Sequence, residues 1–200
     1  MGENPRDDDE PDLHRVNALN LGSGSFYKEG YVNVDLSSEA KVDVAHDLST
    51  FPYPFDDDAF DLVEADHCLE HLPDPFAVMR EIHRITKGGG TVRIRVPHFS
   101  RGFTHSEHKA GFDVTFPYYF KRGWVSYQGV EFRLDDLRLT WFAQPYLKKM
   151  VLPGPVFQAA SAAGAAISFL ANLSPTLCSR VWCFWVGGFE EIEYRFTALK

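Results

Sequence analysis

A glycine turn between two short apolar runs is the feature that most constrains how this chain folds. Leu21-Gly22-Ser23-Gly24 ends the first run, and the second run ends in Asp35, eleven residues after Gly24. Because glycine has no Cβ, a Gly-x-Gly turn lets the main chain approach a ligand closely. A carboxylate at the tip of the neighbouring strand can accept hydrogen bonds from both hydroxyls of a ribose. The turn and the acid together are typical of an α/β protein that holds a nucleoside.

The chain continues with alternating strand and helix signals. Asp74, a favourable N-cap, precedes Pro75, so a helix is predicted from Pro75 to the glycines at 88–90, with Thr86 on its apolar face. Residues 190–199 alternate apolar and polar side chains, which predicts a final antiparallel strand. The β-rich runs predicted to form the other strands are residues 16–21, 31–35, 42–44, 60–64 and 91–96. Strand, helix and strand at this spacing imply a parallel sheet with right-handed crossovers.

Composition indicates one domain. The chain has 200 residues, of which 44% are hydrophobic, enough for a single core over residues 13–200. Residues 1–12 hold six acidic side chains against one arginine, so this tail carries −5 of the formal charge of −8 and is expected to be disordered. The remaining charge, near −3, disfavours nucleic acid as a partner.

The compartment is predicted from the N-terminus and the cysteines. The first thirty residues lack the apolar core of a signal peptide, so we expect a cytoplasmic protein. Cys68, Cys178 and Cys183 have no metal-type spacing, which favours reduced thiols over a zinc site or a disulfide.

An uncharged stretch of thirty residues, 150–179, allows three interpretations. Its alanines and serines favour a buried helix that covers the sheet or forms a dimer contact, within an apolar helical segment spanning residues 146–185. Docking at a membrane surface and a transmembrane span are the alternatives. Pro153, Pro155 and Pro175 interrupt the stretch and count against a span.

Six elements in the same order resemble the class I S-adenosylmethionine-dependent methyltransferases, especially the methyltransferase type 11 group. The match covers roughly residues 15–98 and the C-terminal strand. After the glycine turn and Asp35, the elements that carry it are His46-Asp47-Leu48, Phe60-Asp61-Leu62-Val63, Leu69-Glu70-His71-Leu72 and Glu81-Ile82-His83-Arg84-Ile85-Thr86-Lys87-Gly88-Gly89. The resemblance implies a Rossmann-like three-layer sandwich, with a mostly parallel seven-stranded sheet and an antiparallel last strand.

The resemblance also implies a site for S-adenosylmethionine. Gly22, Ser23 and Gly24 would face its methionine part, and Asp35 with Leu36 would hold its ribose. Four further residues would complete the site: Asp47 and Leu48 beside the adenine, and Asp66 and His67 near the sulfonium. Glu70 and His71 would begin the next turn or cap the following helix.

One departure from the family pattern is the short distance between the glycine turn and the ribose acid. About twenty residues and a full helix usually separate them, whereas here Gly24 to Asp35 leaves room for one turn at most. A loop with Phe26, Tyr27 and Lys28 is expected in place of the helix. We therefore expect a more open cofactor pocket that another segment closes.

Histidines after the fifth strand are the candidate catalytic bases. His98 follows the strand directly, at the sheet edge where ligands bind in open α/β folds. His105 and His108 flank Glu107, which suits a base with an orienting carboxylate. His98 is the first candidate and His108 the second; surface or substrate-orienting histidines and a metal site of all three histidines are the alternatives, and no metal is expected.

Many aromatic residues lie within an expected acceptor-side insertion, residues 97–136, where they would form a lid. The chain is thus expected to transfer a methyl group to an oxygen or nitrogen nucleophile of a small, sugar or lipid-linked acceptor. A nicotinamide oxidoreductase is disfavoured because Tyr27 stands where its third glycine belongs. The main alternative is a non-catalytic binding or scaffold protein of the same fold, docked on a membrane. Peripheral membrane contact and a homodimer are the other partners considered.

Overall fold

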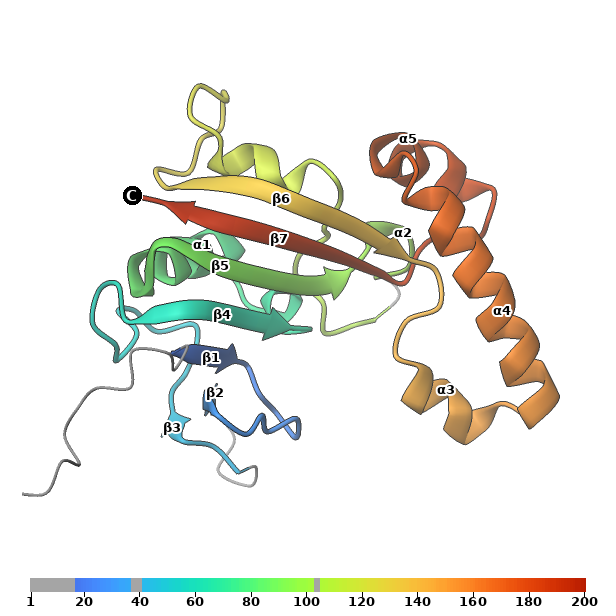
Figure 1. The fold of residues 1–200 in the computed structure, drawn as a ribbon, viewed down its shortest axis with the longest axis horizontal. Helices are drawn as coiled ribbons and strands as arrows, with labels where there is room; N and C mark the ends of the chain where they lie inside the picture. The colour runs from blue at the N-terminus through green and yellow to red at the C-terminus, as the bar shows by residue number, and fades with distance from the viewer. Residues whose placement is uncertain (1–16, 37–40, 103–104) are drawn as a thin grey trace, which may run out of the picture.

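Seven strands form one mixed sheet in the order β3-β2-β1-β4-β5-β7-β6 (Figure 1). The computed structural model describes residues 17–36, 41–102 and 105–200; the acidic tail predicted at residues 1–12 lies outside them. The strands are β1 (Ala18–Leu21), β2 (Tyr31–Asp35), β3 (Val44–Ala45), β4 (Phe60–Asp66), β5 (Thr86–Pro97), β6 (Glu131–Thr140) and β7 (Glu191–Leu199). The helices are α1 (Pro75–Ile85), α2 (Phe99–Gly102), α3 (Pro145–Val151), α4 (Gly154–Ala171) and α5 (Pro175–Arg180), with 3-10 turns η1 (Leu69–His71), η2 (Phe116–Phe120) and η3 (Trp182–Phe184).

The direction of the strands confirms the predicted class. Strands β1 to β5 run parallel to one another, and β7 lies antiparallel between β5 and β6. The chain proceeds outward on one side of β1 to β2 and β3, and then crosses to β4 on the other side. Such a switch point leaves a crevice at the carboxyl ends of β1 and β4, which is where α/β sheets bind ligands.

The two faces of the sheet differ in polarity. On one face Ile94 of β5 lies opposite Tyr194 of β7, both fully buried beside α1 and η2. The other face carries ion pairs, for example Arg93 with Glu64 at 2.6 Å and Arg95 with Glu193 at 2.7 Å. A three-layer sandwich would cover this second face with helices.

Part of that helical layer is replaced by a loop. As predicted, no helix forms in residues 22–30, all of which the structure describes. Instead, Lys28 reaches over the polar face and places Nζ 2.8 Å from Glu64 and 3.1 Å from Asp66. The carboxylates that a helix would cover are therefore paired with cations.

Helix α1 begins as predicted but ends early. Asp74 Oδ1 accepts hydrogen bonds from the backbone N–H groups of Phe76 and Ala77 at 3.0 and 2.9 Å. The predicted end at the glycines is wrong, because Thr86 already has extended backbone angles and starts β5. Gly90 lies close to β4, where a Cβ would come 3.1 Å from the Asp61 carbonyl oxygen.

The predicted aromatic lid over residues 97–136 differs from the structure in its C-terminal part and in the position of its aromatic residues. Residues 131–136 belong to β6, whose alternation is interrupted by a register shift between Leu134 and Asp136. The structure gives little support to the lid interpretation, because four phenylalanines of the segment are buried in the core on one face of the sheet. They are Phe112, Phe116, Phe120 and Phe132, which pack on one another and on Phe76, Tyr194 and Phe196.

Helices α3, α4 and α5 with η3 form a helical arm that extends away from the carboxyl end of β6 (Figure 1). The prediction of a largely buried helix is wrong, since only Gly164 and Ala171 of α4 are buried. The arm is fastened at its base, where the Asn172 side chain pairs with both the N–H and the C=O of Leu139 in β6, at 2.8 and 2.9 Å. By length and composition alone, α4 is the one helix in the described ranges that could cross a membrane.

Candidate functional site

Three cavities meet at His67, the residue that follows β4 and has a left-handed backbone with φ 51°. We name them by one residue each: the Asp35 cavity of about 240 Å³, the Tyr146 cavity of about 460 Å³ and the His108 cavity of about 820 Å³. All three lie at the carboxyl ends of β1 and β4, where the topology places a ligand.

The Asp35 cavity collects most of the predicted cofactor residues. It is lined by Gly22, Asp35, Leu36, Asp47, Leu48, His67, Cys68, His71 and Leu72. Gly22 has φ +70°, and a Cβ there would lie 2.5 Å from Cys68 Sγ, so this position needs glycine. The backbone N–H of Gly24 donates to Asp35 Oδ2 at 2.8 Å, which joins the glycine turn to the acid.

Asp47, on the far side of this cavity, is held as a carboxylate. The backbone N–H and the hydroxyl of Ser49 both donate to Asp47 Oδ1, at 2.8 and 2.7 Å. These hydrogen bonds lower the pKa of Asp47 below its ordinary value. Two carboxylates, Asp35 and Asp47, therefore border a cavity of which Gly22 forms another side.

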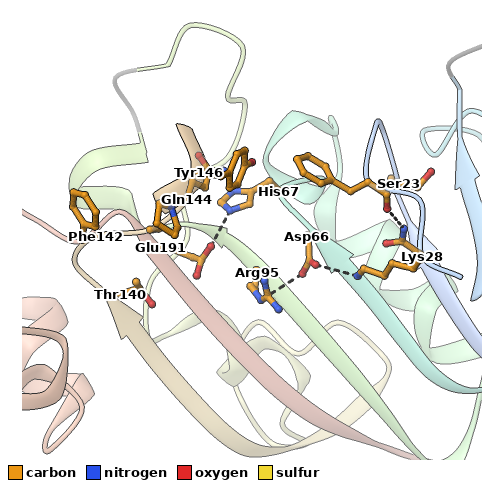
Figure 2. Close-up of a pocket in the computed structure, with 15 residues that line it drawn as sticks. Ser23, Lys28, Asp66, His67, Arg95, Thr140, Phe142, Gln144, Tyr146 and Glu191 are labelled. Atoms are coloured by element: carbon orange, nitrogen blue, oxygen red, sulfur yellow. Dashed lines mark hydrogen bonds and ion pairs between the residues drawn. The ribbon is translucent and has the colours of Figure 1, made fainter. Parts of the chain in front are cut away.

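The Tyr146 cavity lies between the glycine turn and the start of the helical arm (Figure 2). Ser23 and Asp66, both predicted cofactor residues, line it together with Phe142. The ring of Phe26 meets that of Tyr146 edge to face, with centroids 5.7 Å apart. The segment expected to close an open pocket is thus the beginning of α3.

His67 is clamped between two carboxylates. Its Nε2 lies 2.9 Å from Glu191 Oε2 and its Nδ1 lies 3.4 Å from Glu70 Oε1. Burial disfavours a charge on this ring, but the hydrogen bonds to Glu191 and Glu70 outweigh burial and raise the pKa of His67 to about 9. His67 is therefore an imidazolium at neutral pH and a poor proton acceptor.

The His108 cavity brings together a second set of polar side chains. Oxygen and ring nitrogen atoms of Glu70, His71 and His108 lie within 4.8 Å of one another. Glu70 Oε2 is buried and has no hydrogen-bond partner among the residues that the structure describes. The ring of His105 stacks on that of His108 with centroids 4.7 Å apart. This group can accept a proton from a ligand in the cavity, and its spacing would also suit a small cation.

His98, the first predicted base, does not reach any of these cavities. The ring is fully buried; Ser100 donates to its Nδ1, and Nε2 lies 2.8 Å from Ser179 Oγ. Burial lowers its pKa to about 4, so the ring is neutral and fully hydrogen-bonded in the core. The geometry supports a structural role for His98 and leaves His108 as the predicted base that faces a cavity.

Sequence reasoning missed several residues around His67. Glu191 appears in the sequence as one polar position of an alternating strand, and Tyr146 as part of an apolar segment. Lys28 was expected only as part of a loop. None of these positions has a local sequence signal, because each reaches the site through the pairing of strands or through the approach of the helical arm.

The residues present fit a nucleoside cofactor with a methionine part. Asp35 and Asp47 line the cavity beside the glycine turn, and Ser23 Oγ is buried without a hydrogen-bond partner among the described residues. A buried hydroxyl without a partner is costly unless a ligand satisfies it.

Comparison with known proteins agrees with this site. The family described as "Methyltransferase domain" matches residues 22–94. The ajmaline N-methyltransferase of Rauvolfia serpentina is 42% identical over 72 residues, which cover 36% of this chain and 23% of that enzyme. The chain spans less than a quarter of the length of the curated relatives it matches.

Solved structures share the fold over nearly the whole chain. An S-adenosylmethionine-dependent methyltransferase from Mesorhizobium loti superposes with a TM-score of 0.55 at 12% identity, covering 94% of this chain and 93% of that one. A chain from the complex of the Haloferax volcanii Trm112 methyltransferase activator with a methyltransferase gives a TM-score of 0.56 at 16% identity, covering 93% and 84%. With its matched residues 22–94 and this sheet, the chain has the fold of the class I S-adenosylmethionine-dependent methyltransferases and is similar to them over the methyltransferase domain.

Proposed function

We propose that this protein transfers a methyl group from S-adenosylmethionine to an oxygen or nitrogen nucleophile of a small, sugar or lipid-linked acceptor. The observation that carries the proposal is the Asp35 cavity, where a glycine turn faces two carboxylates at the switch point of the sheet. A scaffold has no physical need for this arrangement, whereas a cofactor site does.

The residues of the Asp35 and Tyr146 cavities would hold the cofactor. Asp35 would accept hydrogen bonds from the ribose hydroxyls, and Asp47 would accept one from the adenine amine. Ser23 would bond to the methionine part. When bound, S-adenosylmethionine supplies a methyl group on a positively charged sulfur.

The chain itself contributes alignment and a proton acceptor. Alignment of reacting groups can remove roughly 7 to 11 kcal/mol of a barrier. The His108 cavity adjoins the Asp35 cavity through His67 and His71, so we assign the acceptor to the His108 cavity. There His108 or His71, beside Glu70, would take the proton of the nucleophile.

The charge and the cysteines support the proposed partners and compartment. A body charge near −3 supports an acceptor other than nucleic acid. All three cysteines are buried and free, which supports a reducing compartment such as the cytoplasm.

Methyl transfer to lipid and polar extracts tests the proposal. The protein is incubated with S-adenosylmethionine carrying a labelled methyl group and with chloroform-soluble and water-soluble cell extracts in turn. We expect labelled product from one extract, at least ten-fold less with His108→Gln, and unchanged cofactor affinity in that variant. Full transfer by His108→Gln would remove His108 as the base, and no transfer to either extract by protein that binds the cofactor would contradict the proposed activity.

A further inference from the structure

The helical arm presents a large apolar surface to solvent. Twelve large hydrophobic side chains between residues 146 and 185 are exposed, of which Met150, Val151, Leu173 and Trp185 each have 70% or more of their surface accessible. Large exposed apolar patches on soluble proteins mark interaction sites. The arm is therefore a candidate docking surface.

The charged residues around the arm indicate which kind of partner the arm would bind. Residues 137–189 contain no aspartate or glutamate, although the whole chain is acidic. The bases of this region are Arg138, Lys148, Lys149 and Arg180. Arg138, Lys148 and Arg180 are ion-paired with Asp136, Glu190 and Asp113, and Lys149 on α3 adds a further positive charge beside the apolar surface. An apolar surface with an added lysine complements a membrane leaflet with anionic lipids.

The shape of the arm favours lying on the membrane over crossing it. Helix α4 has 18 residues, about 27 Å in length, whereas a hydrocarbon core is about 30 Å thick. One side of α4 packs on the protein body, where a Cβ at Gly164 would lie 2.5 Å from Phe142 Cβ. At both ends α4 is flanked by a short helix, α3 before it and α5 after it.

Aromatic residues at the end of the arm fit the same surface. Phe184 and Trp185 follow α5 and are 67% and 79% exposed. Tryptophan is enriched where a membrane meets water, because its ring is apolar and its N–H is polar.

The arm is continuous with the proposed active site. Its first residues, Pro145 and Tyr146, line the Tyr146 cavity, while Leu147 and Lys148 line the His108 cavity. We propose that the helical arm docks on the surface of an anionic lipid bilayer and opens these cavities toward it. The acceptor is then an amphipathic molecule that resides in that bilayer, a refinement that rests on the proposed function.

Flotation with lipid vesicles tests the docking. The full chain is mixed with vesicles of phosphatidylcholine alone or with 30% phosphatidylserine, and the bound fraction is measured. We expect binding to the anionic vesicles and roughly five-fold weaker binding for Lys149→Gln, because each base near an anionic surface contributes about that factor. The triple variant Phe169→Glu/Leu173→Glu/Trp185→Glu should lower binding at least ten-fold, since all three side chains are exposed and lie on the arm.

A matched control changes exposed apolar residues elsewhere. Trp124 and Val125, 44% and 93% exposed in the loop before β6, are replaced by glutamate and should leave vesicle binding unchanged. Equal loss in the control, or no binding of the wild type to anionic vesicles, would overturn the proposal. A wild-type dimer that the triple variant converts to a monomer, without vesicle binding, would assign the surface to a second copy and also overturn it.

Cofactor titration on the same samples separates the two proposals. Protein that binds S-adenosylmethionine but not vesicles would refute the docking and leave the proposed function standing. Protein that binds vesicles but not S-adenosylmethionine would refute the proposed function and the acceptor assignment, and leave the docking surface standing.

Discussion

At the scale of single residues, the site depends on a few side chains whose neighbours fix their charge. Asp35 accepts the Gly24 N–H, Asp47 accepts two hydrogen bonds from Ser49, and His67 is held between two carboxylates. Glycine and acid positions could be predicted from the sequence because they follow strands directly. The charge of His67 could not, since Glu191 is 124 residues away in the chain.

Replacement of Asp35 tests the ribose assignment. We expect Asp35→Ala to weaken S-adenosylmethionine binding more than ten-fold, because it removes the acceptor of the ribose hydroxyls and frees the Gly24 N–H. Asp35→Asn keeps an oxygen for Gly24 and should lose less affinity. Isothermal titration calorimetry gives both values, with circular dichroism as the control for folding, and unchanged affinity in Asp35→Ala would refute the assignment.

The charge of His67 predicts a dependence of stability on pH. Its pKa is raised from 6.5 to about 9 in the folded protein, so folding favours the protonated ring. The resulting stabilisation is complete below about pH 6.5 and is lost as the pH rises toward 9.

Urea unfolding between pH 6 and 9 measures this loss. The wild type should lose stability over that range, whereas His67→Asn should show a flatter profile, because asparagine does not titrate and tolerates the left-handed backbone. Parallel profiles for the two proteins would contradict the assigned pKa.

At the scale of elements, local signals predicted α1 and most strands, and long-range packing decided the rest. Asp74 with Pro75 marks the start of α1 unambiguously. Strand β6 has an extra residue near Asp135 that breaks its alternation, so the pattern of period two is hidden. The aromatic residues carry no local sign of whether they face a cavity or the core, and the same holds for α4, whose composition fits a buried or an exposed helix.

The packing of helix α4 against the rest of the protein gives a prediction that has a matched control within the same helix. Gly164 contacts Phe142, and a Cβ there would overlap Phe142 Cβ at 2.5 Å, whereas a Cβ at Gly154 would meet nothing within 4 Å. Gly164→Ala should therefore lower the free energy of unfolding by about 1 to 3 kcal/mol. Gly154→Ala should leave it within about 0.5 kcal/mol of the wild type. Equal unfolding midpoints in urea would show that α4 is not packed against Phe142.

At the scale of the whole molecule, one sheet joins a cofactor site to an exposed helical arm. The polar face of the sheet, the loop with Lys28 and the start of α3 enclose the Tyr146 cavity, so the departure from the family pattern and the arm meet at one place. The short spacing between Gly24 and Asp35 predicted only an open pocket that another segment would cover. The identity of the cover required the three-dimensional structure.

Calorimetric titration of the purified full chain with S-adenosylmethionine, and separately with S-adenosylhomocysteine, in detergent-free buffer tests the central claim most directly. The account predicts micromolar binding of both, with one site per chain. A folded chain that binds neither compound would contradict it and would identify the protein as a non-catalytic scaffold of the methyltransferase fold.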